Sequence, residues 1–137
     1  MESVYFGSSR GWGIGQGDGP WIMADLENGL WASDSRNASE PSITHTFVTA
    51  MLKGKKGAFA IKGGNAQEGP LTTYHEGPRP KGYEKMKLQG AIILGIGGDA
   101  SCRARGTFYE GVMTANYTSD EVDAAIQSNI VAAQYHR

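Results

Sequence analysis

The stretch WIMADLEN, residues 21–28, decides the fold. Apolar side chains occupy every second position, at Ile22, Ala24 and Leu26. The positions between them carry Trp21, Met23, Asp25 and Glu27. Because side chains alternate between the two faces of a β-strand, we predict a strand over residues 21–27, with one face in the core and both carboxylates on the other.

Other apolar runs are bounded by Gly or Pro, which punctuate strands. These runs predict strands over residues 43–52, 58–62, 71–75, 91–96 and 107–114, with residues 53–57 as a solvated hairpin loop. Only the C-terminal tail has a helical pattern. Ser119 suits an N-cap there, and we expect the face that carries Val122, Ile126 and Ile130 to pack on the sheets. Many short strands and one C-terminal helix predict an all-β sandwich.

The composition restricts the class of partner. The chain has 137 residues, 13 of them basic and 14 acidic, so it fits one domain without the positive field that nucleic-acid binding requires. No apolar run approaches the roughly 20 residues of a membrane helix, and MESVYFGSSRG lacks the pattern of a signal peptide. His45, His75 and His136 share no ligand spacing with one another or with Cys102, the single cysteine. We therefore expect no metal, cofactor, nucleic acid or membrane partner.

Two stretches could carry acid chemistry. The predicted strand places Trp21 beside Asp25 and Glu27, and a ring next to carboxylates is typical of a sugar site, although a solvated sheet face fits the same pattern. AIILGIGGD, residues 91–99, predicts a buried strand and a turn that presents Asp99, with a plain tight turn as the alternative. The glycines of residues 11–19 precede a strand rather than the helix of a dinucleotide site, and no GxSxG elbow occurs. Paired carboxylates remain the chemical candidate.

Four motifs point to one family: GDGPWIMADLEN (17–28), AIILGIGGD (91–99), GTFYEGVMT (106–114) and SNIVAAQY (128–135). Over essentially the whole chain they resemble the catalytic domain of fungal-type α-L-arabinofuranosidase B, glycoside hydrolase family 54. The resemblance implies a laminin-G/concanavalin-like β-sandwich, or jelly roll. It also implies a retaining hydrolase that removes terminal non-reducing α-L-arabinofuranosyl groups from arabinoxylan and arabinan, polysaccharides of the plant cell wall.

The same resemblance assigns roles to individual residues. Glu27 matches the nucleophile and Asp99 the acid/base. Trp12, Asp25, Asn28 and the backbone of Gly98 match the contacts to the arabinose ring. A retaining glycosidase needs two carboxyl groups about 5 to 5.5 Å apart, one ionised and one protonated, and two acids from separate strands suit these roles.

The family's catalytic domains are longer, and Met1 resembles an internal methionine of theirs. The resemblance therefore implies that residues 1–137 are a partial catalytic domain, without the N-terminal half, the signal peptide and the arabinose-binding module. An incomplete sandwich exposes sheet edges, which favours self-association. A non-catalytic carbohydrate-binding sandwich and an inactive remnant stay open as alternatives. The family and the glycosylation sequons at residues 37–39 and 116–118 indicate a secreted protein, although this chain shows no signal peptide.

Overall fold

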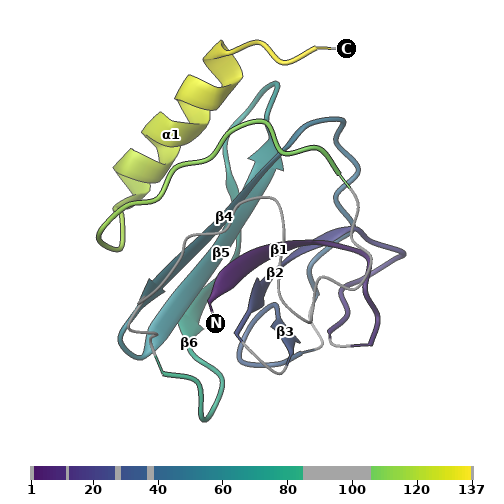
Figure 1. The fold of residues 1–137 in the computed structure, drawn as a ribbon, viewed down its shortest axis with the longest axis vertical. Coiled ribbons are helices and arrows are strands. Elements are labelled where there is room, and N and C mark those ends of the chain that lie inside the picture. The colour runs from purple at the N-terminus through teal and green to yellow at the C-terminus, as the bar shows by residue number, and fades with distance from the viewer. Residues whose placement is uncertain (1, 12, 27–28, 37–38, 85–105, 137) are drawn as a thin grey trace.

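A computed structural model describes residues 2–11, 13–26, 29–36, 39–84 and 106–136 (Figure 1). The elements in chain order are β1 (Ser3–Gly7), β2 (Trp21–Asp25), β3 (Leu30–Trp31), β4 (Val48–Lys55), β5 (Ala58–Asn65), β6 (Thr72–Pro78) and α1 (Asp120–Ala132). The six strands form two three-stranded antiparallel sheets, with strand orders β1-β2-β3 and β4-β5-β6. The predicted β-sandwich with one C-terminal helix is confirmed.

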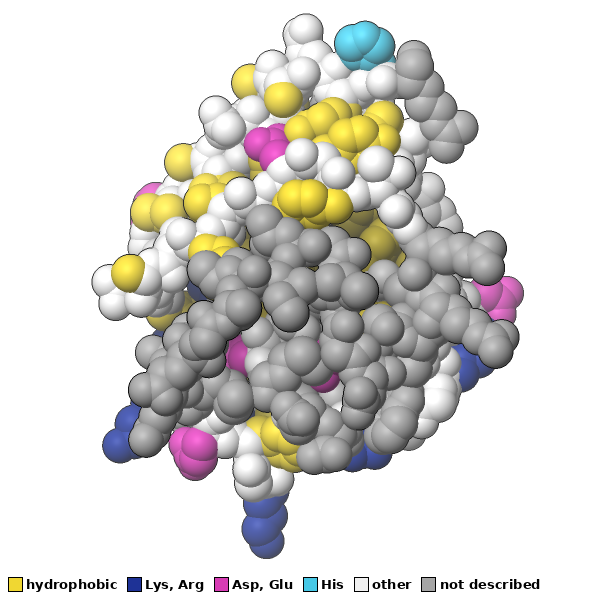
Figure 2. All heavy atoms as spheres, in the orientation of Figure 1, with side chains coloured by type: hydrophobic (Ala, Val, Ile, Leu, Met, Phe, Trp, Pro, Cys, Tyr) yellow, Lys and Arg dark blue, Asp and Glu magenta, His cyan; other side chains and the backbone are white. Residues whose placement is uncertain are grey.

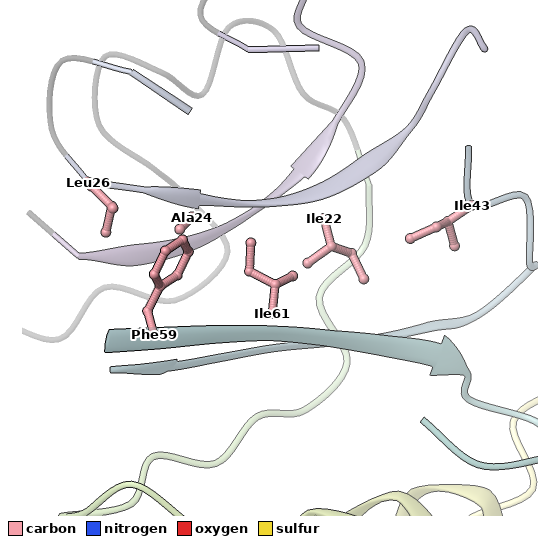
Figure 3. Close-up of a cluster of buried hydrophobic side chains, with 6 residues drawn as sticks. All are labelled: Ile22, Ala24, Leu26, Ile43, Phe59 and Ile61. Atoms are coloured by element: carbon pink, nitrogen blue, oxygen red, sulfur yellow. The ribbon is translucent and has the colours of Figure 1, made fainter. Parts of the chain in front are cut away.

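The core between the sheets forms from the alternating pattern of β2. Figure 3 shows Ile22, Ala24 and Leu26 pointing toward Phe59 and Ile61 of β5. All five side chains are buried, as the period of two predicts. One face of β2 therefore joins the two sheets, and its burial is the main apolar contribution to the sandwich.

The opposite face of β2 is buried as well. Trp21 and Met23 pack with Tyr5, Leu30 and Ala32 in a second apolar cluster. Asp25, on the same face, is only 2% exposed. The alternative of a solvated sheet face is therefore wrong for these residues, because the segment that carries Ile14 and Gly15 packs over this face at Trp21.

Several strand boundaries differ from the prediction. β2 ends at Asp25 rather than at residue 27, and β4 begins at Val48 rather than at residue 43. Ile43 is buried in the core, but its N–H donates to the Pro20 carbonyl outside the β4–β5 ladder. β1 and β3 were not predicted, because five and two residues give too little pattern. The strand predicted over residues 91–96 lies outside the described residues.

The strand predicted over residues 107–114 is wrong. This segment forms no ladder with the part of the chain that the structure describes, and four of its large side chains are at least half exposed. They are Phe108, Tyr109, Val112 and Met113. Figure 2 shows hydrophobic side chains on the surface where this segment and α1 lie in Figure 1. An apolar run bounded by glycine is not enough for a strand, because a strand also needs a neighbour to pair with.

The β4–β5 hairpin turns at Lys56 and Gly57, where Gly57 has a φ of +73° that favours glycine. The hairpin is therefore in the predicted place. The prediction that its lysines are solvated is wrong for Lys53, which lies within β4 and is 6% exposed. A buried lysine needs a counter-charge, and α1 supplies it.

Helix α1 packs on the outer face of β4 and β5 through polar side chains. It begins at the predicted N-cap, where Ser119 Oγ accepts from the Val122 N–H. Val122 itself is 44% exposed, so the predicted apolar face is wrong at this position, and the buried residues of α1 are Asp123 and Gln127. Gln127 Nε2 donates to the carbonyls of Asn65 and Gly69. Among the described residues no helix is long and apolar enough to cross a membrane.

Asp123 is the centre of a buried ionic cluster. Its Oδ2 accepts from Lys53 Nζ at 2.5 Å and from Lys62 Nζ at 2.7 Å, and its Oδ1 accepts from Thr118 Oγ1. Burial alone raises the pKa of Asp123, but these hydrogen bonds outweigh burial and hold the pKa below its ordinary value. The carboxylate therefore stays ionised between two buried lysines.

Replacing Asp123 by Asn tests this cluster. The substitution keeps the shape of the side chain but leaves the two buried ammonium groups with only the exposed Asp120 carboxylate as counter-charge, which costs about 3 to 5 kcal/mol of unfolding free energy. Chemical denaturation of both proteins measures the difference. Asp120→Asn is the matched control, because the Asp120 side chain is 76% exposed and its loss shifts the midpoint much less. Equal shifts for the two variants contradict the assignment.

Candidate functional site

The candidate site begins where β2 ends. Asp25 is the last residue of β2 and lies opposite Ser3 on one side and Leu30 on the other. Beyond it, the Leu26 N–H donates to the Gly29 carbonyl at 3.4 Å, so the chain returns directly into β3. Glu27 and Asn28, the predicted nucleophile and a predicted sugar contact, stand between these two residues in sequence and lie outside the described residues.

A glycine-rich segment, residues 13–19, lies against this hairpin. A Cβ built on Gly13 would stand 2.5 Å from the Leu30 carbonyl oxygen, so only glycine allows the approach. Trp12, a predicted sugar contact, directly precedes Gly13 but lies outside the described residues. The structure thus brings together the chain next to Trp12 and the chain on both sides of Glu27 and Asn28. Asp99 and Gly98 lie outside the described residues, so their roles as acid/base and as backbone contact to the sugar stay predictions.

The sequence reasoning missed a cationic and aromatic group beside the hairpin. The guanidinium carbon of Arg36 lies 5.0 Å from the centre of the Trp31 ring, and the Trp31 and Tyr83 rings are 5.1 Å apart. A Cβ built on Gly29 would stand 3.0 Å from the same guanidinium. The Arg36 guanidinium therefore lies directly against the β2–β3 hairpin at Gly29. Nothing in the spacing of these residues indicates that they meet, because only the fold brings them together.

Glu40 is a second residue that the sequence reasoning missed. Its side chain is buried, and its Oε1 accepts from the Ile22 N–H at 2.6 Å. Its Oε2 has no hydrogen-bond partner among the described residues. Burial raises the pKa of Glu40 to about 7, and the hydrogen bond from Ile22 only partly opposes the rise. A carboxyl group that titrates near neutral pH thus lies at the start of the strand that ends in Asp25.

The remaining groups do not form a competing site. The described residues contain no group of three or more His, Cys, Asp or Glu side chains placed to hold a metal ion. A shallow polar hollow lies at the end of the β4-β5-β6 sheet where β5 finishes. It is lined by His45, Gly64, Asn65, Glu68, Gly69, Pro70, Thr72 and Tyr74. None of the predicted site residues borders it.

Asp25 is a buried acid at the end of β2, and polar groups fixed in this way can orient a small polar ligand. The sequence model of the family described as α-L-arabinofuranosidase B, catalytic, matches residues 1–136. This chain belongs to that family, the catalytic domain of glycoside hydrolase family 54.

The relatives are similar over nearly all of this chain. An α-L-arabinofuranosidase from Hypocrea jecorina is 58% identical over 139 residues, which cover 98% of this chain and 28% of the relative. One solved structure is a GH54 α-L-arabinofuranosidase, a glutamate-to-glutamine mutant soaked with 4-nitrophenyl α-L-arabinofuranoside. It is 52% identical to this chain with a TM-score of 0.91, and the match covers 99% of this chain and 29% of that one. An arabinofuranosidase complexed with arabinofuranosyl-α-1,2-xylobiose is 53% identical with the same TM-score, 0.91, covering 98% and 29%. The chain thus spans little more than a quarter of their length.

The raised pKa of Glu40 predicts how stability changes with pH. The folded chain holds this carboxyl group protonated up to about pH 7, whereas an unfolded chain ionises it above its ordinary value of 4.5. The folded state therefore binds more protons between these values, and the unfolding free energy falls by roughly 3 kcal/mol as pH rises through that window.

Urea unfolding from pH 4.5 to 8 of the unsubstituted chain and of Glu40→Gln measures this contribution as a difference. The difference is needed because burial lowers the pKa of His75, and that shift raises stability as pH increases. Parallel curves for the two proteins contradict the assignment.

Proposed function

We propose that this chain carries the acidic part of the site of a retaining α-L-arabinofuranosidase. In this proposal the enzyme removes terminal non-reducing α-L-arabinofuranosyl groups from arabinoxylan or arabinan. The observation that carries the proposal is the match of the family's catalytic domain to residues 1–136, with the β2–β3 hairpin and the glycine-rich segment packed together. The two arabinofuranoside-bound relatives described above support the same substrate class.

The proposed reaction has two steps. The Glu27 carboxylate attacks the anomeric carbon, while Asp99 gives its proton to the glycosidic oxygen and the aglycone leaves. Asp99 then takes a proton from water, whose oxygen attacks the same carbon, and Glu27 is released as a carboxylate. Both the sugar and the enzyme return to their starting configuration and protonation state.

The other residues hold the sugar in the proposed site. Asp25, Asn28 and the Gly98 backbone bind the ring hydroxyls, and Trp12 covers an apolar face of the ring. The burial of Asp25 supports a fixed orientation of its carboxyl group, since the ladder to Ser3 and Leu30 holds its backbone. Arg36 lies against Gly29, which follows the proposed nucleophile and sugar contact, Glu27 and Asn28, in the sequence.

Release of 4-nitrophenol from 4-nitrophenyl α-L-arabinofuranoside tests the reaction. We expect release by the purified chain, and a loss of at least about 100-fold in Glu27→Gln and in Asp99→Asn, because each removes one of the two carboxyl groups that the mechanism requires. Glu68→Gln is the control, since this exposed acid lies at the polar hollow. Undiminished release by either site variant refutes the assignment of that residue.

A non-catalytic carbohydrate-binding sandwich is the second candidate. Two observations favour it. Residues 107–114 are exposed and pair with no described strand, and the chain covers only 28% of the length of the Hypocrea jecorina relative, so further residues of such a relative could be required for turnover. Equilibrium binding of arabinofuranosyl-xylobiose with no release of arabinose identifies this candidate. Neither binding nor release identifies an inactive remnant.

We also propose that the chain self-associates through the open edge of β1. Among the described residues β1 pairs only with β2, and its Val4 and Phe6 side chains are 45% and 37% exposed. An unpaired edge with apolar side chains is a template for another strand.

Sedimentation velocity at micromolar concentration tests whether the chain associates through the edge of β1. We expect a dimer for the unsubstituted chain and a monomer for Phe6→Lys, because a charge on an edge strand opposes pairing. Val122→Lys on α1 is the matched control and keeps the dimer. A monomer in all three proteins refutes the proposal.

An extracellular location for the protein is a further part of the proposal. It is supported by the exposure of Asn116, the acceptor of the sequon at residues 116–118. Its substrates, polysaccharides of the plant cell wall, also lie outside the cell that secretes it.

A further inference from the structure

A short strap, residues 39–43, crosses the start of β2 and ties it to the glycine-rich segment. The Ile43 N–H donates to the Pro20 carbonyl, and Ser42 Oγ accepts from the Gly19 N–H. Ser42 Oγ also donates to the Gln16 carbonyl at 2.9 Å. The strap therefore contacts both segments that border the candidate site.

Glu40 makes the central contact of this strap. Its backbone carbonyl accepts from the Gln16 N–H at 2.8 Å, while its side-chain Oε1 accepts from the Ile22 N–H at 2.6 Å. One residue thus bonds to the glycine-rich segment through its backbone and to β2 through its side chain. The contact is tight, because a Cβ on Gly15 would stand 2.7 Å from the Glu40 carbonyl oxygen and 2.3 Å from the Trp21 ring.

An acid is an unusual group for a contact that serves packing alone. Glu40 is 4% exposed, and only one of its two carboxyl oxygens has a hydrogen-bond partner among the described residues. An amide could accept from the same N–H without a titratable group. From β2 the Ile22 N–H faces the Glu40 carboxyl group, and from β6 Tyr74 is a titratable side chain whose pKa is raised by burial and by the Glu40 charge.

We propose that Glu40 is a positioning residue of the candidate site, which sets the spacing between the glycine-rich segment and β2 through its bonds to Gln16 and Ile22. The proposal rests on the function proposed above. Trp12 precedes the glycine-rich segment in the sequence, and Asp25 is the last residue of β2. The spacing between the two segments therefore affects two predicted sugar contacts.

The path from Glu40 to the site is short and stiff. Ile22 and Asp25 are three residues apart on one strand, or roughly 10 Å. From Gln16 the chain runs back to Gly13, which touches the Leu30 carbonyl in the strand next to Asp25. Gain or loss of a proton at Glu40 changes the strength of its bond to the Ile22 N–H, and both segments respond because neither can move without the other.

Amide NMR of the ¹⁵N-labelled chain across the pH range tests the proposal without relying on activity. We expect the signals of Ile22, Gly13 and Asp25 to shift with one common midpoint. Glu40→Gln abolishes all three shifts, and the control Glu68→Gln leaves them unchanged. Shifts confined to Ile22, or shifts that persist in Glu40→Gln, overturn the proposal.

A second variant, Glu40→Met, removes the acceptor and keeps a similar volume. We expect hydrogen exchange at Ile22 to quicken by about tenfold or more in this variant, whereas Glu40→Gln keeps the protection of the unsubstituted chain. In hydrolysis of the 4-nitrophenyl arabinofuranoside, Glu40→Met raises KM by about tenfold with a smaller effect on kcat, and Glu40→Gln restores KM. An unchanged KM in a folded Glu40→Met protein overturns the proposal.

The two proposals fail in different ways. If the unsubstituted chain releases no 4-nitrophenol, the proposed function fails for this chain, while the common pH midpoint of the three amides still decides whether Glu40 couples the two segments. If release occurs but the three amides titrate independently, the function stands and the positioning role is refuted.

Discussion

The burial of β2 on both faces is the constraint on which the rest of this structure depends. One face packs on β5 and joins the two sheets, and the other packs under the glycine-rich segment, while β1 and β3 pair with its two edges. A strand buried in this way has no freedom to slip, because a shift of one residue would exchange the two apolar faces and move Asp25 to the other one. The acid at its end is thus held by the same contacts that form the core.

That constraint explains why the candidate site is made of backbone as much as of side chains. Gly13 meets the Leu30 carbonyl, Gln16 meets Glu40, and Leu26 meets Gly29, each through main-chain atoms. Such contacts leave little room for adjustment, since they allow no rotamer change. Fixed groups of this kind can hold the hydroxyls of a small ring, such as the furanose of the proposed substrate, in one orientation.

The sequence predicted the parts of the fold that depend on local pattern. The alternation predicted for residues 21–27 is confirmed over residues 21–26, and the β4–β5 hairpin and the Ser119 cap are confirmed apart from boundaries. It could not predict what depends on partners distant in sequence. The sequence predicts a solvated Lys53, because only the fold brings Asp123 of α1 to it. It also predicts a strand over residues 107–114, although no described residue pairs with this segment. Likewise, only the fold brings Glu40 to Ile22 and Arg36 to Trp31.

The ionic cluster under α1 gives the helix a different thermal character from the sandwich it covers. The sheets are joined mainly by apolar contacts, whose exposure raises the heat capacity, whereas separating Asp123 from Lys53 and Lys62 hydrates charged groups and lowers it. The penalty for burying these charges also shrinks on warming, because ion hydration weakens as temperature rises. Warming therefore reduces the penalty that opposes docking of α1 on the sheet.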